Sequence, residues 1–283
     1  MNNPKLYSTA NNLQRRDAKD VIDEYLHLIR WKPAGDDTIL DVGCGSGDIT
    51  WDLLMPRLPG SFQKLIGTDL SLAMTKHAQA QYTHPSIEFA VLDIASDCVP
   101  DNYRERFDHV FSFYCLHWIQ DQRRAMDNIY DLVRPGGDIL LTFLASTPLF
   151  EIYLRMSKMT PWKTYMQDVK NYVSPYHNVI DVEGKLRKLL QEVGFQITIC
   201  ECKEKYFEYP NLEIVKKSMT AVNPFMPRLP EKLKEQFVID YCTQLKNLKL
   251  IEENNNYANN INNNGRKIHM NYSLIVICAQ KAL

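Results

Sequence analysis

The sequence predicts an α/β fold built on a parallel β-sheet with crossover helices. Short apolar segments alternate with helical patterns from Thr38 to Phe143, as in repeated β-α-β units. The first apolar segment, residues 38–42, runs directly into the glycine-rich turn Gly43–Gly47, and a helical pattern begins at Asp48. With 283 residues, of which 45% are hydrophobic, the chain can bury one large core.

The glycine-rich turn, with Gly43, Gly45 and Gly47, indicates a cofactor-binding loop. Glycine has no Cβ and tolerates positive φ, so a ligand can lie against the main chain. The third glycine comes one residue too early for the dinucleotide fingerprint, and the carboxylate of Asp41 would repel a pyrophosphate. A ligand with a positive charge fits better. A purely structural tight turn is the alternative.

Each of the next two predicted strands leads to an acidic residue. The strand Lys64–Asp69 places Asp69 about twenty residues after the loop, where a β-α-β unit carries the acid that accepts the ribose hydroxyls. Residues 87–94 predict a third strand whose exit carries Asp93 and Ile94. For both acids, ordinary turn chemistry is the alternative.

Further strands continue the alternation. The fourth is expected at Phe107–Phe113 and the fifth at Asp138–Phe143. Between them, the Pro-Gly-Gly of Arg134–Gly137 is expected to end a helix that includes Val133. The later pattern predicts a helix at Val182–Glu192, a strand at Phe195–Tyr206 and a last strand at Met270–Ala279.

The glycine loop and the Pro-Gly-Gly turn resemble segments of class I S-adenosylmethionine-dependent methyltransferases. The resemblance implies a Rossmann-like fold with a mainly parallel seven-stranded sheet, one domain over residues 1–283, S-adenosylmethionine as cofactor and S-adenosylhomocysteine as product. It also implies that Asp69 holds the ribose, that Asp93 holds the adenine amino group and that Ile94 packs on the adenine ring. The cofactor-binding residues so implied are Asp41, Gly43, Cys44, Gly45, Asp69, Leu70, Met74, Asp93, Ile94, Ser112 and Phe113.

Two segments, 148–178 and 207–253, are expected to form a helical cap over the substrate site. The first is rich in aromatic residues and methionine, and an insertion beyond the strand ends is well placed to close a substrate chamber. Ordinary helical core packing is the alternative. The predicted substrate-pocket residues are Phe150, Met156, Trp162, Tyr165 and Met166. Residues 254–265 are rich in asparagine and predict a loop, to which no function is assigned.

The segment Leu116-His117-Trp118, together with Asn12–Asp17, resembles insect juvenile hormone acid methyltransferases over nearly the whole chain. More distant relatives with similar elements, the trans-aconitate and malonyl-carrier-protein methyltransferases, also methylate carboxylates. A carboxylate is already ionised at neutral pH and needs no general base. Gln14 and Trp118 are expected to orient it with neutral N–H donors, and His117 to add a donor or shape the wall.

The sequence therefore predicts methyl transfer to an apolar carboxylic acid such as juvenile hormone acid or farnesoic acid. Another small carboxylic acid, either a fatty acid or an aconitate-like polyanion served by Arg15 and Arg16, stays open. So does an amine or phenol acceptor. A non-catalytic binding protein would be expected to lack the loop acid or glycines, which are all present. The sequence does not decide which acid or which stereoisomer is preferred. It also leaves open whether this is the main enzyme or a paralogue, and what the oligomeric state is, with a homodimer among the alternatives.

Composition narrows the remaining classes of function. A formal net charge of -1 provides no positive field for nucleic acid. Seven cysteines without framework spacing suggest reduced thiols, and metal binding is not expected. The chain has no apolar signal region near Met1 and no run of eighteen apolar residues, so a cytoplasmic protein without membrane insertion is expected.

Overall fold

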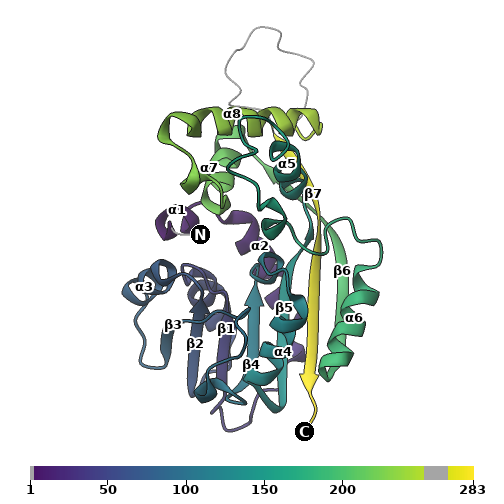
Figure 1. Cartoon of the computed structure of the whole chain (residues 1–283). Helices are drawn as coiled ribbons and strands as arrows, with labels where there is room; N and C mark the ends of the chain where they lie inside the picture. The colour runs from purple at the N-terminus through teal and green to yellow at the C-terminus, as the bar shows by residue number, and fades with distance from the viewer. Residues whose placement is uncertain (1–2, 252–266) are drawn as a thin grey trace.

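The computed structural model describes residues 3–251 and 267–283. Within these residues, seven strands form one sheet in the order β3-β2-β1-β4-β5-β7-β6 (Figure 1). The strands are β1 Thr38–Val42, β2 Lys64–Asp69, β3 Ile87–Val91, β4 Phe107–Phe113, β5 Val133–Ser146, β6 Phe195–Tyr209 and β7 Ile268–Lys281. Strands β1 to β5 pair in parallel, whereas β7 runs antiparallel to both β5 and β6. The predicted α/β class with a mainly parallel seven-stranded sheet is confirmed.

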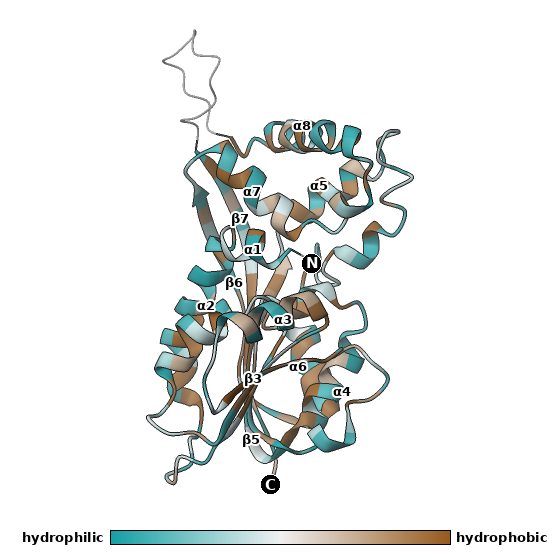
Figure 2. Cartoon of the chain, turned by 90° about the vertical axis from the view of Figure 1, so that its left-hand side faces the viewer, coloured by the Kyte–Doolittle hydropathy of each residue, from teal (hydrophilic) through white to brown (hydrophobic). Residues whose placement is uncertain are grey.

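Helices cover both faces of the sheet because its strands alternate buried side chains between them. Along β1, Ile39 belongs to the buried cluster that includes residues of α2 and α3, and Leu40 belongs to the cluster that includes residues of α4 and α6. These helices are α2 Asn12–Tyr25, α3 Leu72–Gln81, α4 Gln122–Leu132 and α6 Val182–Val193. Hydrophobic residues concentrate in the sheet and on the helix sides that face it (Figure 2).

A group of helices lies beyond the carboxyl ends of the parallel strands (Figure 1). It consists of α5 Pro148–Met156, α7 Leu212–Val222 and α8 Glu231–Asn247, and we call it the cap. The long strands β6 and β7 reach up to it, and the short N-terminal helix α1 Pro4–Ser8 lies between it and the sheet (Figure 1). Of the segment 207–253, residues 207–209 belong to β6 rather than to a helix. The Asn-rich segment 254–265 lies outside the described residues.

Short turns of helix connect these elements. They are η1 Leu26–Leu28, the π-helical turn η2 Thr50–Leu54, η3 Met55–Arg57, η4 Asp101–Tyr103, η5 Leu116–Trp118, η6 Val169–Tyr172 and η7 Met226–Arg228. No helix in the described part of the chain combines the length and the apolar character needed to cross a lipid bilayer.

The Pro-Gly-Gly segment differs from its prediction. Helix α4 ends at Leu132, and Val133 already belongs to β5. The pairing of β5 with β4 then skips from Val133 to Asp138, so the segment forms an irregularity inside the strand and not a turn before it. Gly136 has φ of 80° and a Cβ on Gly137 would lie 2.6 Å from the Asp108 carbonyl oxygen. Glycine is therefore needed to keep the chain in the sheet.

Candidate active site

Two adjoining cavities lie at the carboxyl ends of the parallel strands, where open α/β sheets bind ligands. The larger has a volume of about 440 Å³ and the smaller about 60 Å³. Tyr7, Tyr114, Trp118 and Val222 line both and form their common boundary. The larger cavity is further lined by Val42, Gly43, Gly45, Asp69, Leu70, Leu92, Asp93, Ile94, Ala95, Cys115, Ile119, Gln120, Asp121, Asn171, Tyr172 and Pro224. The smaller is further lined by Leu13, Gln14, His117, Leu144, Thr147, Leu149, Phe150, Tyr209, Val215, Ser218, Met219, Tyr241 and Met270.

The glycine loop forms one wall of the larger cavity. Gly43 and Gly45 have φ of 77° and 57°, in the left-handed region that side chains rarely adopt. The N–H groups of Gly43 and Cys44 donate to the Thr68 carbonyl oxygen at 2.7 and 2.8 Å, which fixes the loop to β2. A Cβ on Gly43 would lie 2.3 Å from Cys115 Cβ and Sγ, so the loop passes η5 with no room for a side chain.

Asp69 lies at the end of β2 and lines the larger cavity. Its carboxylate accepts the Gly45 N–H at 3.0 Å and the Ser71 N–H at 2.8 Å. Burial raises the pKa of this carboxyl above its usual range despite these bonds. The carboxylate thus connects the glycine loop to the start of α3 beside the cavity.

Asp93 follows β3 and is more open. One of its carboxylate oxygens accepts the Ala95 N–H at 2.9 Å, and the residue is exposed. The next residue, Ile94, is buried and also lines the cavity. An exposed acid beside a buried apolar side chain suits a ligand with a polar edge and a flat apolar face.

Asp41 lies behind the glycine loop and faces η2. Thr50 Oγ1 donates to one carboxylate oxygen at 2.5 Å, and the other oxygen, Oδ1, is buried without a partner. Burial, opposed by the Thr50 bond and assisted by the charges of Asp69 and Asp48, raises the pKa of Asp41 to about 7. Among the described residues that line the larger cavity there are aspartates but no lysine or arginine. The site therefore suits a ligand that carries positive charge.

His117 and Trp118 on η5 and Gln14 on α2 line the smaller cavity. Burial lowers the pKa of His117 to about 3, so its ring is neutral near pH 7. Its Nδ1 accepts the Leu144 N–H at 3.5 Å, which places the ring proton on Nε2 and makes Nε2 a donor. Within the described residues, the Gln14 amide and the Trp118 indole N–H have no hydrogen-bond partner. The geometry thus brings three neutral donors to one small cavity.

Comparison with known proteins assigns the chain to a family. A family model described as a methyltransferase domain matches residues 13–199. Juvenile hormone acid O-methyltransferase of Bombyx mori is 38% identical over 282 residues, which cover 99% of this chain and 98% of that protein. The protein of the same name from Drosophila melanogaster is 39% identical over 283 residues, covering 99% of this chain and 93% of that protein. The chain belongs to the juvenile hormone acid O-methyltransferase family. It is an S-adenosylmethionine-dependent methyltransferase, as the sequence predicted.

Solved structures agree with this methyltransferase fold. A putative methyltransferase from Bacillus halodurans C-125 matches with a TM-score of 0.56 at 18% identity, covering 95% of this chain and 100% of that chain. The [4+2]-cyclase SpnF matches with a TM-score of 0.53 at 14% identity, covering 95% and 82%. Because a cyclase shares the fold, these neighbours support the architecture, and the activity rests on family membership.

The larger cavity of this methyltransferase fits the sulfonium cofactor, and we call it the cofactor cavity. The acids on its lining, Asp69 and Asp93, and the glycine backbone at Gly43 and Gly45 are groups that suit a cationic ligand. No metal is needed for this fit, and the described residues contain no group of three or more His, Cys, Asp or Glu placed to hold one. We call the smaller cavity, which shares Trp118 with the cofactor cavity, the acceptor cavity after the role that we propose for it.

The predicted cofactor residues divide into two groups. Those that line the cofactor cavity are Gly43, Gly45, Asp69, Leu70, Asp93 and Ile94. Those that lie behind its wall are Asp41, Cys44, Met74, Ser112 and Phe113. Ser112, for example, donates its hydroxyl to the Val42 carbonyl oxygen at 2.8 Å and so joins β4 to β1. For this second group, a role toward the cofactor stays a prediction.

The predicted substrate-pocket residues divide in the same way. Phe150 lines the acceptor cavity, edge-on to the Trp118 ring at 6.2 Å between ring centroids. Met156, Trp162 and Met166 are fully buried and do not line it, and neither does the half-buried Tyr165. Trp162 Nε1 donates to Asp240 at 2.8 Å, which attaches its loop to α8. These side chains build the interior of the cap around the cavity.

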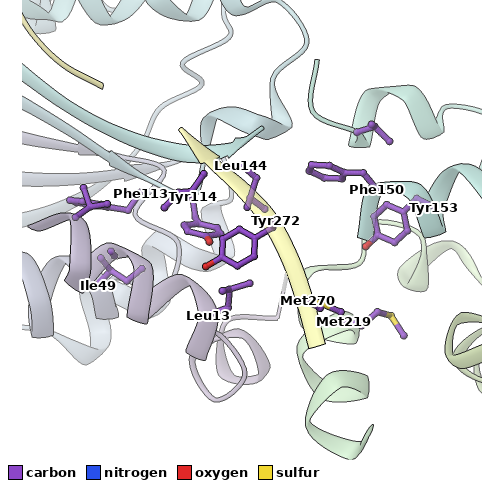
Figure 3. Packing of buried hydrophobic residues seen from close by; sticks show 14 of the residues in the cluster. Leu13, Ile49, Phe113, Tyr114, Leu144, Phe150, Tyr153, Met219, Met270 and Tyr272 are labelled. Carbon is purple, nitrogen blue, oxygen red and sulfur yellow. The ribbon is translucent and has the colours of Figure 1, made fainter. Parts of the chain in front are cut away.

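Sequence reasoning missed Tyr114, which lines both cavities. Its backbone has φ of 60°, a rare conformation for a residue other than glycine and one that clusters at functional sites. Its hydroxyl donates to the fully buried Asp17, which also accepts the Tyr272 hydroxyl at 2.7 Å and pairs with Lys205 at 3.0 Å. The tyrosine-cysteine pair after the fourth strand was the available signal, since it follows an apolar strand. Figure 3 shows the ring of Tyr114 beside that of Tyr272.

Arg15 and Arg16, on which the alternative of a polyanionic acceptor rested, pair with acidic residues instead of lining the acceptor cavity. Arg15 pairs with Asp48 at 2.6 Å and with Asp52 at 2.9 Å. Arg16 pairs with Asp17 at 3.0 Å and lies over the Phe207 ring. Neither arginine lines the acceptor cavity, and no lysine lines it within the described part of the chain.

Proposed function

We propose that this methyltransferase converts the carboxylate of an apolar acid, juvenile hormone acid or farnesoic acid, to its methyl ester. The observation that carries the proposal is the acceptor cavity, where Gln14, His117 and Trp118 offer neutral donors next to the cofactor cavity. The relatives in Bombyx mori and Drosophila melanogaster, both named juvenile hormone acid O-methyltransferase, support the same substrate class.

The three donors would orient the acceptor. A carboxylate is ionised at neutral pH, and neutral N–H groups can hold it without the strong neutralisation of an arginine pair. When bound, S-adenosylmethionine supplies an electrophilic methyl group on its sulfonium. Trp118 lines both cavities, so its position can align the carboxylate oxygen with that group. Such alignment can contribute roughly 7–11 kcal/mol to catalysis.

No general base is required by this mechanism. The reacting carboxylate has no proton to lose, and His117, whose pKa burial lowers to about 3, is already neutral at physiological pH. We assign His117 a donor role through Nε2. A methyl ester and S-adenosylhomocysteine would be the products.

The rest of the acceptor cavity supports an apolar tail. Its lining contains Leu13, Leu144, Phe150, Met219 and Met270. A volume of about 60 Å³ is far below the roughly 300–1,000 Å³ of cavities that enclose drug-sized ligands, so the cap must move for a long acid to enter. We propose that α5, α7 and α8 act as this moving cap within a single domain. A homodimer and a cytoplasmic location stay predictions from the sequence.

Incubation with labelled S-adenosylmethionine and a panel of acceptors tests the substrate class. The panel contains juvenile hormone acid, farnesoic acid, a saturated fatty acid, aconitate and phosphoethanolamine. We expect transfer to the two farnesoid acids at the highest kcat/KM. Faster transfer to aconitate or to phosphoethanolamine would overturn the proposal.

Variants of two donors test the carboxylate site. Gln14→Ala or Trp118→Phe removes one donor and should lower kcat/KM by about ten- to a hundredfold, or roughly 1–3 kcal/mol, because a charged acceptor loses one hydrogen bond. Calorimetric affinity for S-adenosylhomocysteine should change far less. Gln81→Ala at the exposed end of α3 and Trp51→Phe on η2 are matched controls outside both cavities. If the donor variants methylate farnesoic acid as fast as these controls, the acceptor assignment fails.

A further inference from the structure

Aromatic rings dominate the boundary between the cofactor cavity and the acceptor cavity. Of the four residues that line both, Tyr7, Tyr114 and Trp118 are aromatic, and the fourth is Val222. Tyr7 lies on α1, between the cap and the sheet (Figure 1), whereas Tyr114 and Trp118 follow β4. No carboxylate lines both cavities in the described part of the chain. We call Tyr7, Tyr114 and Trp118 the aromatic collar.

The two tyrosines of the collar are neutral, and their hydroxyls interact with the protein. The Tyr114 hydroxyl donates to Asp17, and the Tyr7 hydroxyl lies within hydrogen-bonding range of the Asn11 side chain. Burial raises the pKa of both phenols above the usual range, so neither loses its proton near pH 7. The tyrosines therefore contribute uncharged rings to the boundary.

Packing fixes the rings on both sides of the boundary. A Cβ on Gly45 would lie 3.4 Å from Tyr7 Cε1, so the Tyr7 ring lies against the glycine loop. The rings of Tyr114 and Trp118 lie 5.8 and 4.7 Å from the His117 ring, measured between ring centroids. The collar thus extends from the loop beside the cofactor cavity to the histidine of the acceptor cavity.

Methyl transfer requires the sulfonium of the cofactor and the carboxylate of the acceptor to meet where the two cavities join. We propose that the rings of Tyr7, Tyr114 and Trp118 bind the sulfonium cation through cation–π contacts. This assignment rests on the proposed function, which places the carboxylate at Gln14, His117 and Trp118. It adds a site that recognises the positive charge on the sulfur of the cofactor.

Aromatic rings suit this position better than a carboxylate would. The face of a ring attracts a cation through its quadrupole but carries no net charge, so it does not repel the acceptor carboxylate. A ring also offers no oxygen that could compete for the methyl group. Once the sulfur–carbon bond breaks and the carboxylate oxygen gains the methyl group, the sulfur is a neutral thioether. The collar therefore favours S-adenosylmethionine over S-adenosylhomocysteine and assists release of the product.

Calorimetry with S-adenosylmethionine and with S-adenosylhomocysteine, in the absence of an acceptor, tests the collar. The wild type should bind S-adenosylmethionine more tightly. Tyr7→Leu keeps an apolar side chain but removes the ring, so it should lower the ratio of the two affinities roughly three- to thirtyfold. Tyr7→Phe keeps the ring and should keep the ratio within about twofold of the wild type. Tyr103→Leu, on η4 outside both cavities, is the control for loss of a ring and should leave the ratio unchanged.

A second ring keeps the test decisive if Tyr7→Leu does not fold, because Trp118→Leu should lower the same ratio. A wild-type ratio near one, or a ratio unchanged in Tyr7→Leu and Trp118→Leu, would overturn the inference while leaving carboxyl methylation intact. Equal losses in Tyr7→Leu and Tyr7→Phe would also overturn it, because the hydroxyl and not the ring would then bind the cofactor. If the wild type methylates no acid of the acceptor panel, the proposed function itself fails, and the affinity ratio is measured independently of that result.

Discussion

His117 shows how burial fixes the chemistry of a single residue. Its ring lies 4.7 Å from Trp118, 5.8 Å from Tyr114 and 6.1 Å from Phe150, measured between ring centroids. These apolar neighbours exclude water, which disfavours the charged imidazolium and lowers the pKa to about 3. His117, which the sequence predicts to add a donor or to shape the cavity wall, is therefore a neutral donor. The dependence of kcat on pH should show no inflection near pH 6.5.

The same burial makes stability depend on pH. Between the ordinary histidine pKa of about 6.5 in the unfolded chain and the folded value of about 3, only the unfolded state binds the proton. The free energy of unfolding should therefore fall as pH drops through this range. His117→Gln removes the effect, so between pH 7 and pH 5 the variant should lose about 2 kcal/mol less than the wild type in urea titrations. Parallel losses in the two proteins would contradict a buried neutral ring.

At the scale of one element, the glycine loop is constrained by the strand and turn beside it. Gly43 donates to Thr68 on β2 and passes within contact of Cys115 before η5. The loop can present its backbone to the cofactor because no Cβ intervenes on that side. Its shape is thus set jointly by β2 and by the segment after β4.

Gly43→Ala tests this constraint. The new Cβ would lie 2.3 Å from Cys115 and the residue would keep φ of 77°. We expect a destabilisation of roughly 2–5 kcal/mol from overpacking and left-handed strain, with loss of S-adenosylhomocysteine binding. Gly60→Ala is the matched control, since no atom lies within 4 Å of its added Cβ, and it should change stability by less than about 1 kcal/mol. Thermal unfolding measures the stability of both variants, and calorimetry measures their affinity for S-adenosylhomocysteine. Equal values for the two variants would exclude the close approach of Gly43 to Cys115.

At the scale of the whole molecule, Asp17 joins parts of the chain that are far apart in sequence. From α2 it accepts the hydroxyls of Tyr114 after β4 and Tyr272 on β7, and it pairs with Lys205 on β6. The N-terminal arm, the boundary of the two cavities and the long strands below the cap thus meet at one fully buried carboxylate. Such a group needs all its partners, because an unpaired buried charge is costly.

Asp17→Asn should lower the free energy of unfolding by roughly 3–5 kcal/mol, because Lys205 and Arg16 lose a buried counter-charge. Asp20→Asn provides the control, since Asp20 pairs with the same Lys205 at 2.8 Å but is largely solvent-accessible. That surface pair should contribute less than about 1 kcal/mol. Urea unfolding of both variants measures the difference, and a loss of similar size in each would rule out a special role for Asp17.

The sequence by itself determined the local features. Runs of apolar residues predict the strands β1, β2 and β4, and glycine and turn chemistry predict the glycine loop, the acid at the end of β2 and the acid after β3. All of these signals act between near neighbours. Gly194 is also a local feature, since its left-handed φ of 114° ends α6, close to the end of the helix predicted at Val182–Glu192.

Only the tertiary structure decided which side chains line the cavities. Helical spacing makes Phe150 and Met156 look alike, yet only Phe150 reaches the acceptor cavity. The sequence left Arg16 open as a partner for a substrate anion, whereas in the fold this arginine pairs with Asp17. Tyr7 and Tyr241, from opposite ends of the chain, line the same cavity. The periodicity of apolar residues predicts that a side chain is buried. The residues against which it packs depend on contacts between segments that are far apart in the sequence, and no local pattern contains that information.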